Sequence, residues 1–308
     1  MGSRELVAFI RMGRLPLLFG GFLYYLFGAL TAMAAGYPLS VMRILLGYAI
    51  LGPAHLSVHF SNDYFDIDGD RWGRPTGVSG GSGVLTGRPD LRPRARTVAL
   101  VLIGISFVVG TWAYFTVLPT LFLPALLVLG NGIGWFYSAP PVRLSSRGLG
   151  EAATATAIGL LIPGMGYLAI AGSLDLAYLL ATLPLLLYGV AFILSVEIPD
   201  READDLSGKR TFIVRNDIRA GMRLALAATF LSTALYLTAP FTGILPPAIP
   251  VVAVALVSLI PLGYQLSANL KAPRGERELA NFAQHTVLSL IAFAVLADAS
   301  LLIAVLGR

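Results

Sequence analysis

Cysteine is absent from this chain of 308 residues, and charged residues are scarce. Without cysteine the chain can form neither a disulfide framework nor a thiolate metal site. Asp, Glu, Lys and Arg make up 13% of the residues, whereas soluble domains contain about 25%. Hydrophobic residues make up 56%. This composition argues against a soluble globular protein and favours one that lies in a membrane.

The hydrophobic residues are gathered into long blocks. A stretch of about 18 or more mainly apolar residues can cross a bilayer as a helix. The first block could alternatively be a signal peptide, because Ala32-Met33-Ala34 resembles a cleavage site, but its apolar run exceeds the usual length of about 7–15 residues. We therefore predict an all-α integral membrane protein, with a single domain over residues 1–308 and nine transmembrane helices. The predicted helices cover residues 15–35, 39–61, 97–117, 119–138, 151–171, 176–196, 221–239, 244–264 and 284–306.

The basic residues that give the net charge of +5 are unevenly placed. If nine helices alternate across the membrane, all 22 Lys and Arg residues except Arg43 and Arg308 fall on one side. The positive-inside rule makes that side cytoplasmic. We therefore predict a multi-pass protein of the cell membrane with its N-terminus in the cytoplasm and its C-terminus outside. Such basicity suits membrane lipids and anionic substrates and does not indicate a nucleic-acid partner.

The stretch NDYFDIDGD, residues 62–70, places four aspartates and an asparagine at the end of the second apolar block. Residues spaced by four share a helix face, so Asn62, Asp66 and Asp70 are expected to converge, with Asp63 beside them. Asp68 is turned roughly 200° from Asp66, at about 100° per residue. Several oxygen atoms should therefore meet at the cytoplasmic end of this helix, while Asp68 faces elsewhere.

This acidic cluster has three interpretations. A simple solvated helix end is disfavoured, because like charges on one face repel and negative charge at a helix C-terminus opposes the helix dipole. A calcium loop is also disfavoured, because the glycine that belongs at the sixth position stands fourth, as Gly69, and the twelfth position is Gly77 instead of Glu. Magnesium fits better, since it binds a few carboxylates and shares its shell with water and substrate phosphates.

A second acidic cluster follows the sixth apolar block, in SVEIPDREADDLSGKRT, residues 195–211. Glu197, Asp200 and Asp204 are spaced by three and four and are expected on one helix face, with Glu202 pointing away. Pro199 removes a backbone hydrogen bond and is expected to kink this helix end. Acidic residues at a membrane edge are functional by default. The two clusters lie on the same predicted side and could hold two Mg²⁺ ions around one diphosphate.

Together the two motifs resemble those of the UbiA-type intramembrane prenyltransferases. The resemblance includes N-D-x-x-D-x-x-x-D at residues 62–70, D-x-x-x-D at residues 200–204, and YSAPPVRLSSRGLGE after the fourth block, and it covers nearly the whole chain. It implies nine transmembrane helices in a ring around a central cavity, which opens toward the cytoplasmic motifs and laterally toward lipid. It also implies Mg²⁺-dependent transfer of an isoprenyl chain from an allylic polyprenyl diphosphate to an acceptor, most often an aromatic ring.

The resemblance also implies roles for the acidic residues. One Mg²⁺ would be held by Asn62, Asp66 and Asp70, and the other by Asp200 and Asp204. The four aspartates in this set would be the catalytic residues, acting through the metal ions. Asp63 and Glu197 would lie beside these ligands, and Glu197 stands where many relatives have asparagine.

Four further residues are candidates for binding the diphosphate. Tyr137 and Arg143 match family positions near the diphosphate, and Lys209 and Arg74 are candidates because of their charge. For Lys209 and Arg74 the alternative is a basic membrane anchor, and for Tyr137 it is an aromatic interface anchor. Cationic groups at this place would stabilise the charge that develops on the departing diphosphate.

Three more polar residues within the apolar blocks are candidates for positions inside the bundle. His59 and His55 precede the first motif by about one and two turns on the same helix face. We expect His59 to line the cavity, although a membrane-embedded histidine can also be a hydrogen-bonded packing residue. Asp298, in the ninth block, should face the bundle or a partner instead of lipid.

Short sequences beside the motifs bear on the acceptor. GGSGVL at residues 80–85 and EIPDREADDLSGKRT resemble the menaquinone-pathway branch, which prenylates 1,4-dihydroxy-2-naphthoate. The Pro-Pro pair in YSAPP is common across the superfamily and does not select this branch. A glyceryl phosphate lipid, as in digeranylgeranylglyceryl phosphate synthesis, is an alternative acceptor, as are homogentisate- and hydroxybenzoate-type rings.

Two alternatives lie outside acceptor prenylation. A transporter would also contain acidic residues, but transporters usually carry them near the bilayer midplane on broken helices, whereas both clusters here lie at one membrane face. A cyclase could use the same ionisation of a diphosphate without any acceptor. The motif spacing favours the transferase.

Overall fold

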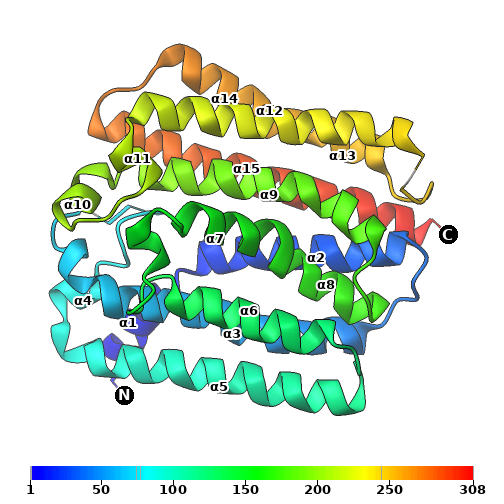
Figure 1. Ribbon diagram of the computed structural model, residues 1–308, viewed down its shortest axis with the longest axis horizontal. Helices are drawn as coiled ribbons and strands as arrows, with labels where there is room; N and C mark the ends of the chain where they lie inside the picture. The colour runs from blue at the N-terminus through cyan, green and yellow to red at the C-terminus, as the bar shows by residue number, and fades with distance from the viewer. Residues whose placement is uncertain (1, 74, 77, 244, 308) are drawn as a thin grey trace.

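The computed structural model describes residues 2–73, 75–76, 78–243 and 245–307, and within these ranges all of the regular secondary structure is helical, without strands (Figure 1). In chain order the elements are α1 (Ser3–Met12), α2 (Leu15–Ala34), α3 (Val41–Asp70), α4 (Val84–Gly87), η1 (Pro89–Leu91), α5 (Arg92–Thr116), α6 (Phe122–Phe136), η2 (Leu144–Arg147), α7 (Gly150–Thr156), the π-helical η3 (Ala157–Leu161), α8 (Ile162–Ala171), α9 (Leu176–Glu197), α10 (Arg201–Leu206), α11 (Phe212–Arg215), α12 (Ile218–Thr242), α13 (Val251–Val257), α14 (Leu259–Lys271) and α15 (Glu276–Leu306). The all-α prediction is therefore confirmed.

The chain is a multi-pass integral membrane protein. Eight helical stretches within the described residues are long and apolar enough to cross a membrane, and they correspond to eight of the nine predicted segments. The segment predicted at 119–138 contains the apolar helix α6, which has only 15 residues. At 1.5 Å per residue α6 rises about 22 Å, which is less than the roughly 30 Å of a bilayer core. A ninth crossing through α6 stays a prediction.

Several predicted helix boundaries were wrong by more than a turn. The segment predicted at 244–264 corresponds to α13 and α14, which run from Val251 to Lys271. The sequence LPPAIP, residues 245–250, explains the late start, because proline lacks a backbone N–H and disfavours helix at the residue before it. The helices α3 and α15 are longer than predicted. Their additional turns are polar, so a prediction based on apolar blocks did not include them.

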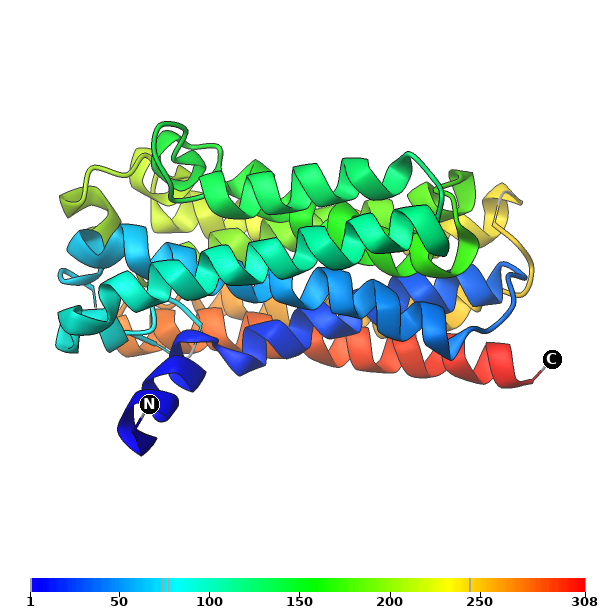
Figure 2. The ribbon, with the colours of Figure 1, turned by 90° about the horizontal axis from the view of Figure 1, so that it is seen from below.

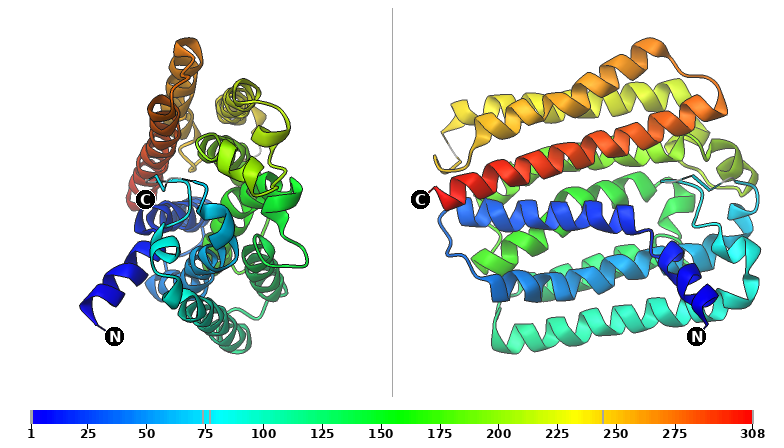
Figure 3. Two further views of the ribbon diagram at one scale, coloured as in Figure 1. Left: turned by 90° about the vertical axis from the view of Figure 1, so that its left-hand side faces the viewer. Right: turned by 180° about the vertical axis from the view of Figure 1, so that it is seen from behind.

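The two acidic motifs lie at one end of the bundle, together with the N-terminus. The end of α3 and the short helix α10 lie at the left of Figure 1, whereas the C-terminus lies at the opposite end in Figure 1, in Figure 2 and in the right panel of Figure 3. The helix α1, which we did not predict, projects from the bundle at the end with the motifs (Figure 2). The cytoplasmic location of that end stays a prediction from the charge distribution.

Small residues allow the helices that line the interior to approach closely. The helices α2 and α8 are in extensive contact. A Cβ atom at Gly28 would overlap the carbonyl group of Pro163, and one at Gly166 would overlap that of Tyr25. Membrane helices commonly use glycine in this way, because no hydrophobic effect drives their association within lipid.

The outer surface of the bundle is apolar. Large hydrophobic side chains on the peripheral helices are strongly exposed, as expected where lipid covers them: Val108, Phe115, Phe241, Leu256 and Leu270. The interior contains a large hydrophobic cluster built mainly from α2, α8, α9 and α15.

Labelling of introduced cysteines can test the orientation in the membrane. The chain has no cysteine of its own. We expect Thr86→Cys and Ser207→Cys, both exposed near the acidic motifs, to react with an impermeant maleimide only from the cytoplasmic side. Leu39→Cys, which is 59% exposed and lies between α2 and α3, should react only from the outside. Labelling of Thr86→Cys and Ser207→Cys from different sides would contradict the shared location of the two motifs.

Candidate active site

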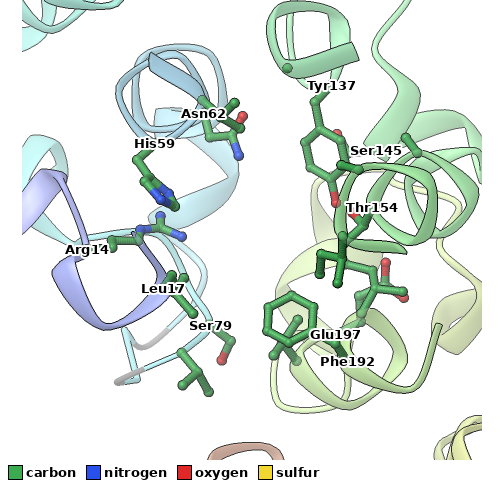
Figure 4. A pocket seen from close by; sticks show the side chains of 18 of the residues that line it. Arg14, Leu17, His59, Asn62, Ser79, Tyr137, Ser145, Thr154, Phe192 and Glu197 are labelled. Carbon is green, nitrogen blue, oxygen red and sulfur yellow. The ribbon is translucent and has the colours of Figure 1, made fainter. Parts of the chain in front are cut away.

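A cavity of about 340 Å³ lies inside the bundle and reaches both acidic motifs. Its walls come mainly from α2, α3, α6, α7, η3, α9 and α15, and no described residue of α5, α12, α13 or α14 lines it. Figure 4 shows two facing walls, one with Arg14, His59 and Asn62 and the other with Tyr137 and Glu197. Apolar side chains line much of the rest of the cavity, and its polar groups gather at the end with the motifs. A volume of about 300–1,000 Å³ is typical of small-ligand sites.

The first motif is helical up to its last residue, because α3 continues to Asp70. As a result Asn62, Asp66 and Asp70 all line the cavity. The side chain of Asp68 is 76% exposed, and its Oδ1 lies 3.6 Å from Nη1 of Arg71. The structure therefore confirms which residues of this motif share a face.

The Asp66 carboxylate is held by a neighbouring serine that we did not single out. Ser138 Oγ donates to Asp66 Oδ2 at 2.8 Å and lies 3.3 Å from Asn62 Oδ1. The other oxygen, Asp66 Oδ1, is buried and has no hydrogen-bond partner among the described residues. Because an unpaired buried carboxylate oxygen is costly, this oxygen is suited to bind a ligand from the cavity.

The second motif differs from the continuous, kinked helix that we predicted. The helix α9 ends at Glu197, a turn covers Ile198 to Asp200, and α10 begins at Arg201. Pro199 lies in this turn and cannot supply the N–H that would continue the helix. Glu197, Asp200 and Asp204 still line the cavity, and Glu202 is exposed. The residues predicted to converge therefore do so across a helix break.

Lys209 lies between the two motifs. Its Nζ is 3.0 Å from Asp204 Oδ1 and 3.8 Å from Asp66 Oδ2. Burial by itself would lower the pKa of Lys209, but the charges of Asp66 and Asp204 raise it, so the ammonium group stays charged. Burial, followed by the charge of Asp204, raises the pKa of Asp200 to about 7. This end of the cavity therefore favours the binding of cations and, through Lys209, of an anion next to them.

The loop between α3 and α4 folds over the motifs and contacts both of them. The backbone N–H of Gly80 donates to Asp200 Oδ2 at 2.9 Å. The backbone N–H of Ser82 donates to Asp63 Oδ1 at 3.2 Å, and the Ser82 hydroxyl donates to Asp63 Oδ2. Gly81 lies against the carboxylate of Asp70. This glycine-rich loop therefore connects α3 to the second motif.

Asp63, although part of the first motif, is not among the residues that line the cavity. Its Oδ1 accepts a hydrogen bond from Arg14 Nη2 at 2.9 Å. Arg14 itself lines the cavity, although from the sequence it is only one of the basic residues predicted on the cytoplasmic side. Asp63 thus connects Arg14 to the loop of Ser82.

The four candidates for binding the diphosphate do not share one location. Tyr137 and Lys209 line the cavity. Arg143 is exposed and is not among the lining residues, so the structure does not bring it to the site. Arg74 lies outside the described residues.

The two histidines of α3 both line the cavity. Their rings are 5.3 Å apart between centroids. His59 is 6% exposed, and its Nε2 has no hydrogen-bond partner in the part of the chain that the structure describes. Asp298 is 7% exposed, faces the interior of the bundle as expected, and lies outside the cavity.

The oxygen atoms of the two motifs fit a divalent cation that also keeps other ligands. The amide and carboxylate side chains that face the cavity are hard oxygen donors, and Asp66 Oδ1 has no partner in the described part of the chain. Among the described residues, no three acidic or histidine side chains converge closely enough to form a metal site by themselves. Mg²⁺ usually binds through one or two carboxylates and completes its shell with water and substrate phosphates. The arrangement therefore fits Mg²⁺ shared with a phosphorylated substrate and does not fit a cage made of protein alone.

Comparison with known proteins decides the family. The profile of the UbiA prenyltransferase family matches residues 21–288. This chain belongs to the UbiA prenyltransferase family. It is therefore an enzyme, a prenyltransferase.

Solved structures show the same fold at low sequence identity. The chain is similar to a UbiA homolog from Archaeoglobus fulgidus bound to GPP and Mg²⁺, with a TM-score of 0.67, 16% identity, and coverage of 95% of this chain and 99% of that one. It is similar to a UbiA homolog from Aeropyrum pernix K1, with a TM-score of 0.66, 15% identity, and coverage of 92% and 97%. A digeranylgeranylglyceryl phosphate synthase gives a TM-score of 0.60 at 16% identity, with coverage of 96% and 100%. A comparison with curated protein sequences finds no significant match.

Sequence reasoning missed three residues of this UbiA-type site. Ser138 is adjacent to Tyr137 in a stretch that we had connected with the family, so it could have been found there. Arg14 carries no local signal, because it reaches the cavity only through packing against a distant segment. Ser79 lines the cavity from the loop between α3 and α4, next to the glycine-rich stretch, and was not singled out there.

Proposed function

We propose that this UbiA-family enzyme transfers an isoprenyl chain from an allylic polyprenyl diphosphate to 1,4-dihydroxy-2-naphthoate in a Mg²⁺-dependent reaction of menaquinone biosynthesis. The observation that carries the proposal is the meeting of the two acidic motifs around Lys209 at one end of a largely apolar cavity. The similar Archaeoglobus fulgidus structures contain GPP or DMAPP together with Mg²⁺, which supports a prenyl diphosphate as donor. The proposed site faces the cytoplasm of the cell membrane, in accordance with the distribution of basic residues.

The residues present can bind the donor in one orientation. Asn62, Asp66 and Asp70 would hold one Mg²⁺, and Asp200 and Asp204 would hold the other. Bound Mg²⁺ would supply positive charge that stabilises the negative charge on the departing diphosphate. Lys209 donates to a diphosphate oxygen as its C–O bond breaks, and the hydroxyl of Tyr137 is available as a further donor. The isoprenyl chain lies in the apolar part of the cavity, which excludes the water that would otherwise quench the allylic cation.

The proposed transfer step needs no strong base at the attacked carbon. The ring carbon that bears the carboxylate attacks the allylic carbon, so a C–C bond forms as the bond to the diphosphate breaks. The carboxylate then leaves as carbon dioxide, and its bonding electrons return to the ring. The products are inorganic diphosphate, carbon dioxide and a prenylated naphthalenediol.

A second acceptor class has some structural support. The fold is shared with a digeranylgeranylglyceryl phosphate synthase, an enzyme named for a glyceryl phosphate lipid product. In that chemistry the acceptor hydroxyl must lose a proton, and its phosphate would need extra cationic contacts. The resemblance of GGSGVL and EIPDREADDLSGKRT to the naphthoate branch favours the aromatic acceptor.

Purified enzyme with Mg²⁺ and a radiolabelled allylic diphosphate can test the acceptor. We expect 1,4-dihydroxy-2-naphthoate to give a lipid-soluble product together with carbon dioxide. Geranylgeranylglyceryl phosphate serves as the competing acceptor. Product from the glyceryl phosphate and none from the naphthoate would reverse the assignment of the acceptor. EDTA should stop either reaction, and added Mg²⁺ should restore it.

The Mg²⁺ requirement should depend on pH. The pKa of Asp200 is raised to about 7 by burial, and a protonated carboxyl group cannot bind the metal. As the pH falls below about 7, the Mg²⁺ concentration for half-maximal activity should therefore rise, by up to about tenfold per pH unit for one competing proton. Mg²⁺ titrations at several pH values with saturating substrates would measure this, and a half-saturation value independent of pH would contradict it.

A further inference from the structure

Two polar side chains on the α2–α3 wall of the cavity have unused hydrogen-bonding groups. Nε of Arg14 and Nε2 of His59 are buried and have no partner within the described parts of the chain. Both residues line the cavity, and both lie on the same wall in Figure 4. Since buried polar atoms without partners are costly, these two atoms point to a ligand that the cavity receives.

The position of Arg14 is defined by contacts that leave part of its guanidinium group free. Arg14 Nη2 donates to Asp63 Oδ1 at 2.9 Å, while Asp63 also accepts from the backbone and hydroxyl of Ser82. The Arg14 backbone has φ 44° and ψ 58°, a left-handed conformation that is uncommon for a residue with a side chain. The surrounding structure therefore holds Arg14 in place, and a planar guanidinium with five N–H donors keeps the capacity to bind an anion.

The facing wall is unsuited to an anion. Glu197 lines that side, with Tyr137 beside it, and one oxygen of Glu197 is buried without a partner in the described chain. The side chains labelled on this wall in Figure 4 include no Lys or Arg, so an anion there would lack a cationic partner. Lys209, the cation at the acidic end, is already in contact with Asp204. An organic anion other than the diphosphate would therefore bind on the Arg14 side.

We propose that Arg14 and His59 form a subsite for the anionic group of the acceptor. This proposal rests on the proposed function only in assuming that an acceptor enters the cavity. The shared chemistry is an oxyanion, which can come from an aromatic carboxylate or from a phosphate monoester. Arg14 binds the oxyanion, and His59 contributes a hydrogen bond, so that the acceptor is oriented with its reactive atom toward the allylic carbon.

Binding measurements without the prenyl donor test this subsite. The probes are 1,4-dihydroxy-2-naphthoate, its analogue 1,4-naphthalenediol, which lacks the carboxylate, and glycerol 1-phosphate. We expect the wild-type enzyme to bind at least one of the two anions more tightly than the neutral diol. Arg14→Gln should weaken binding of that anion by about tenfold to a hundredfold, the range for a hydrogen bond to a charged group, and should leave binding of the diol unchanged. Arg14→Lys should recover part of the loss.

Matched variants separate binding from structure. Arg11→Gln, at an exposed position on α1, and His285→Asn, at an exposed position on α15, should leave both affinities unchanged. Asp63→Asn disrupts the ion pair with Arg14 and weakens the contact with Ser82 but keeps the guanidinium. If Asp63→Asn retained the preference for the anion, the subsite would be supported. If Asp63→Asn lost the preference as fully as Arg14→Gln, Arg14 would only hold the loop, and the proposal would be overturned.

Steady-state kinetics test whether Arg14 binds the acceptor or the diphosphate donor. They also test the subsite separately from the identity of the acceptor. Arg14→Gln should raise the KM for the acceptor and leave the KM for the allylic diphosphate nearly unchanged. A rise in the donor KM alone would show that Arg14 binds the diphosphate and would overturn the proposal. A wild-type enzyme that used only the phosphate acceptor, with the same loss in Arg14→Gln, would overturn the naphthoate assignment and support the subsite.

Discussion

Asp66→Ala and Asp204→Ala should each reduce prenyl transfer by about a hundredfold or more, while the protein remains folded in detergent. Each substitution removes a carboxylate that faces the cavity from one of the two motifs. The expected loss follows from the size of electrostatic stabilisation by a single preorganised group at a reacting centre. The assay is product formation from a radiolabelled allylic diphosphate at saturating Mg²⁺, with size-exclusion chromatography as the measure of folding.

Acidic residues from the same two segments provide the controls. Asp68→Asn and Glu202→Gln change carboxylates that are exposed and lie outside the cavity, so these variants should keep most of the activity. If all four variants lost activity equally, the assignment of roles by the face on which each residue lies would be wrong.

Gly81→Ala should abolish activity, because it should displace the loop that covers the motifs. Gly81 has φ +67°, and an added Cβ would overlap the carboxylate of Asp70. The left-handed backbone costs a residue with a side chain about 1–2 kcal/mol, and the overlap requires either the loop or the Asp70 carboxylate to shift. We expect the loop to move away from Asp70 and Asp200, and we expect activity to fall more than thermal stability.

Gly87→Ala is the matched control in the same segment. An added Cβ at Gly87 meets nothing within 4 Å, and its φ is not positive. Both variants should be compared for activity and for their melting temperature in detergent. Full activity of Gly81→Ala would show that the loop can move without disturbing the ligands of the first motif.

Local periodicity explains why much of the candidate site could be predicted. In an α-helix the direction of each side chain depends on its position along the chain. The spacing of Asn62, Asp66 and Asp70 therefore placed them on one face, and the same geometry turned Asp68 to the outside. The apolar blocks predicted membrane helices for the same reason, because length and hydropathy are properties of a continuous stretch.

Predictions were less successful where local signals conflict. A hydropathy count treats LPPAIP as apolar, although its prolines delay the start of α13 to Val251. The turn from Ile198 to Asp200 ends α9, where spacing alone had suggested a continuous helix. In both cases backbone hydrogen bonding, which proline interrupts, outweighed the pattern of side chains.

By itself the sequence determined that this protein is a helical membrane protein with two acidic motifs, because helix formation and side-chain direction depend on neighbours within a few residues. Only the tertiary structure decided which residues surround the motifs. Arg14 meets Asp63 across 49 positions, and Gly80 meets Asp200 across 120. Arg143, close to Tyr137 in sequence, is exposed outside the cavity. Such contacts depend on how whole helices and loops pack, and a local sequence pattern does not predict that packing.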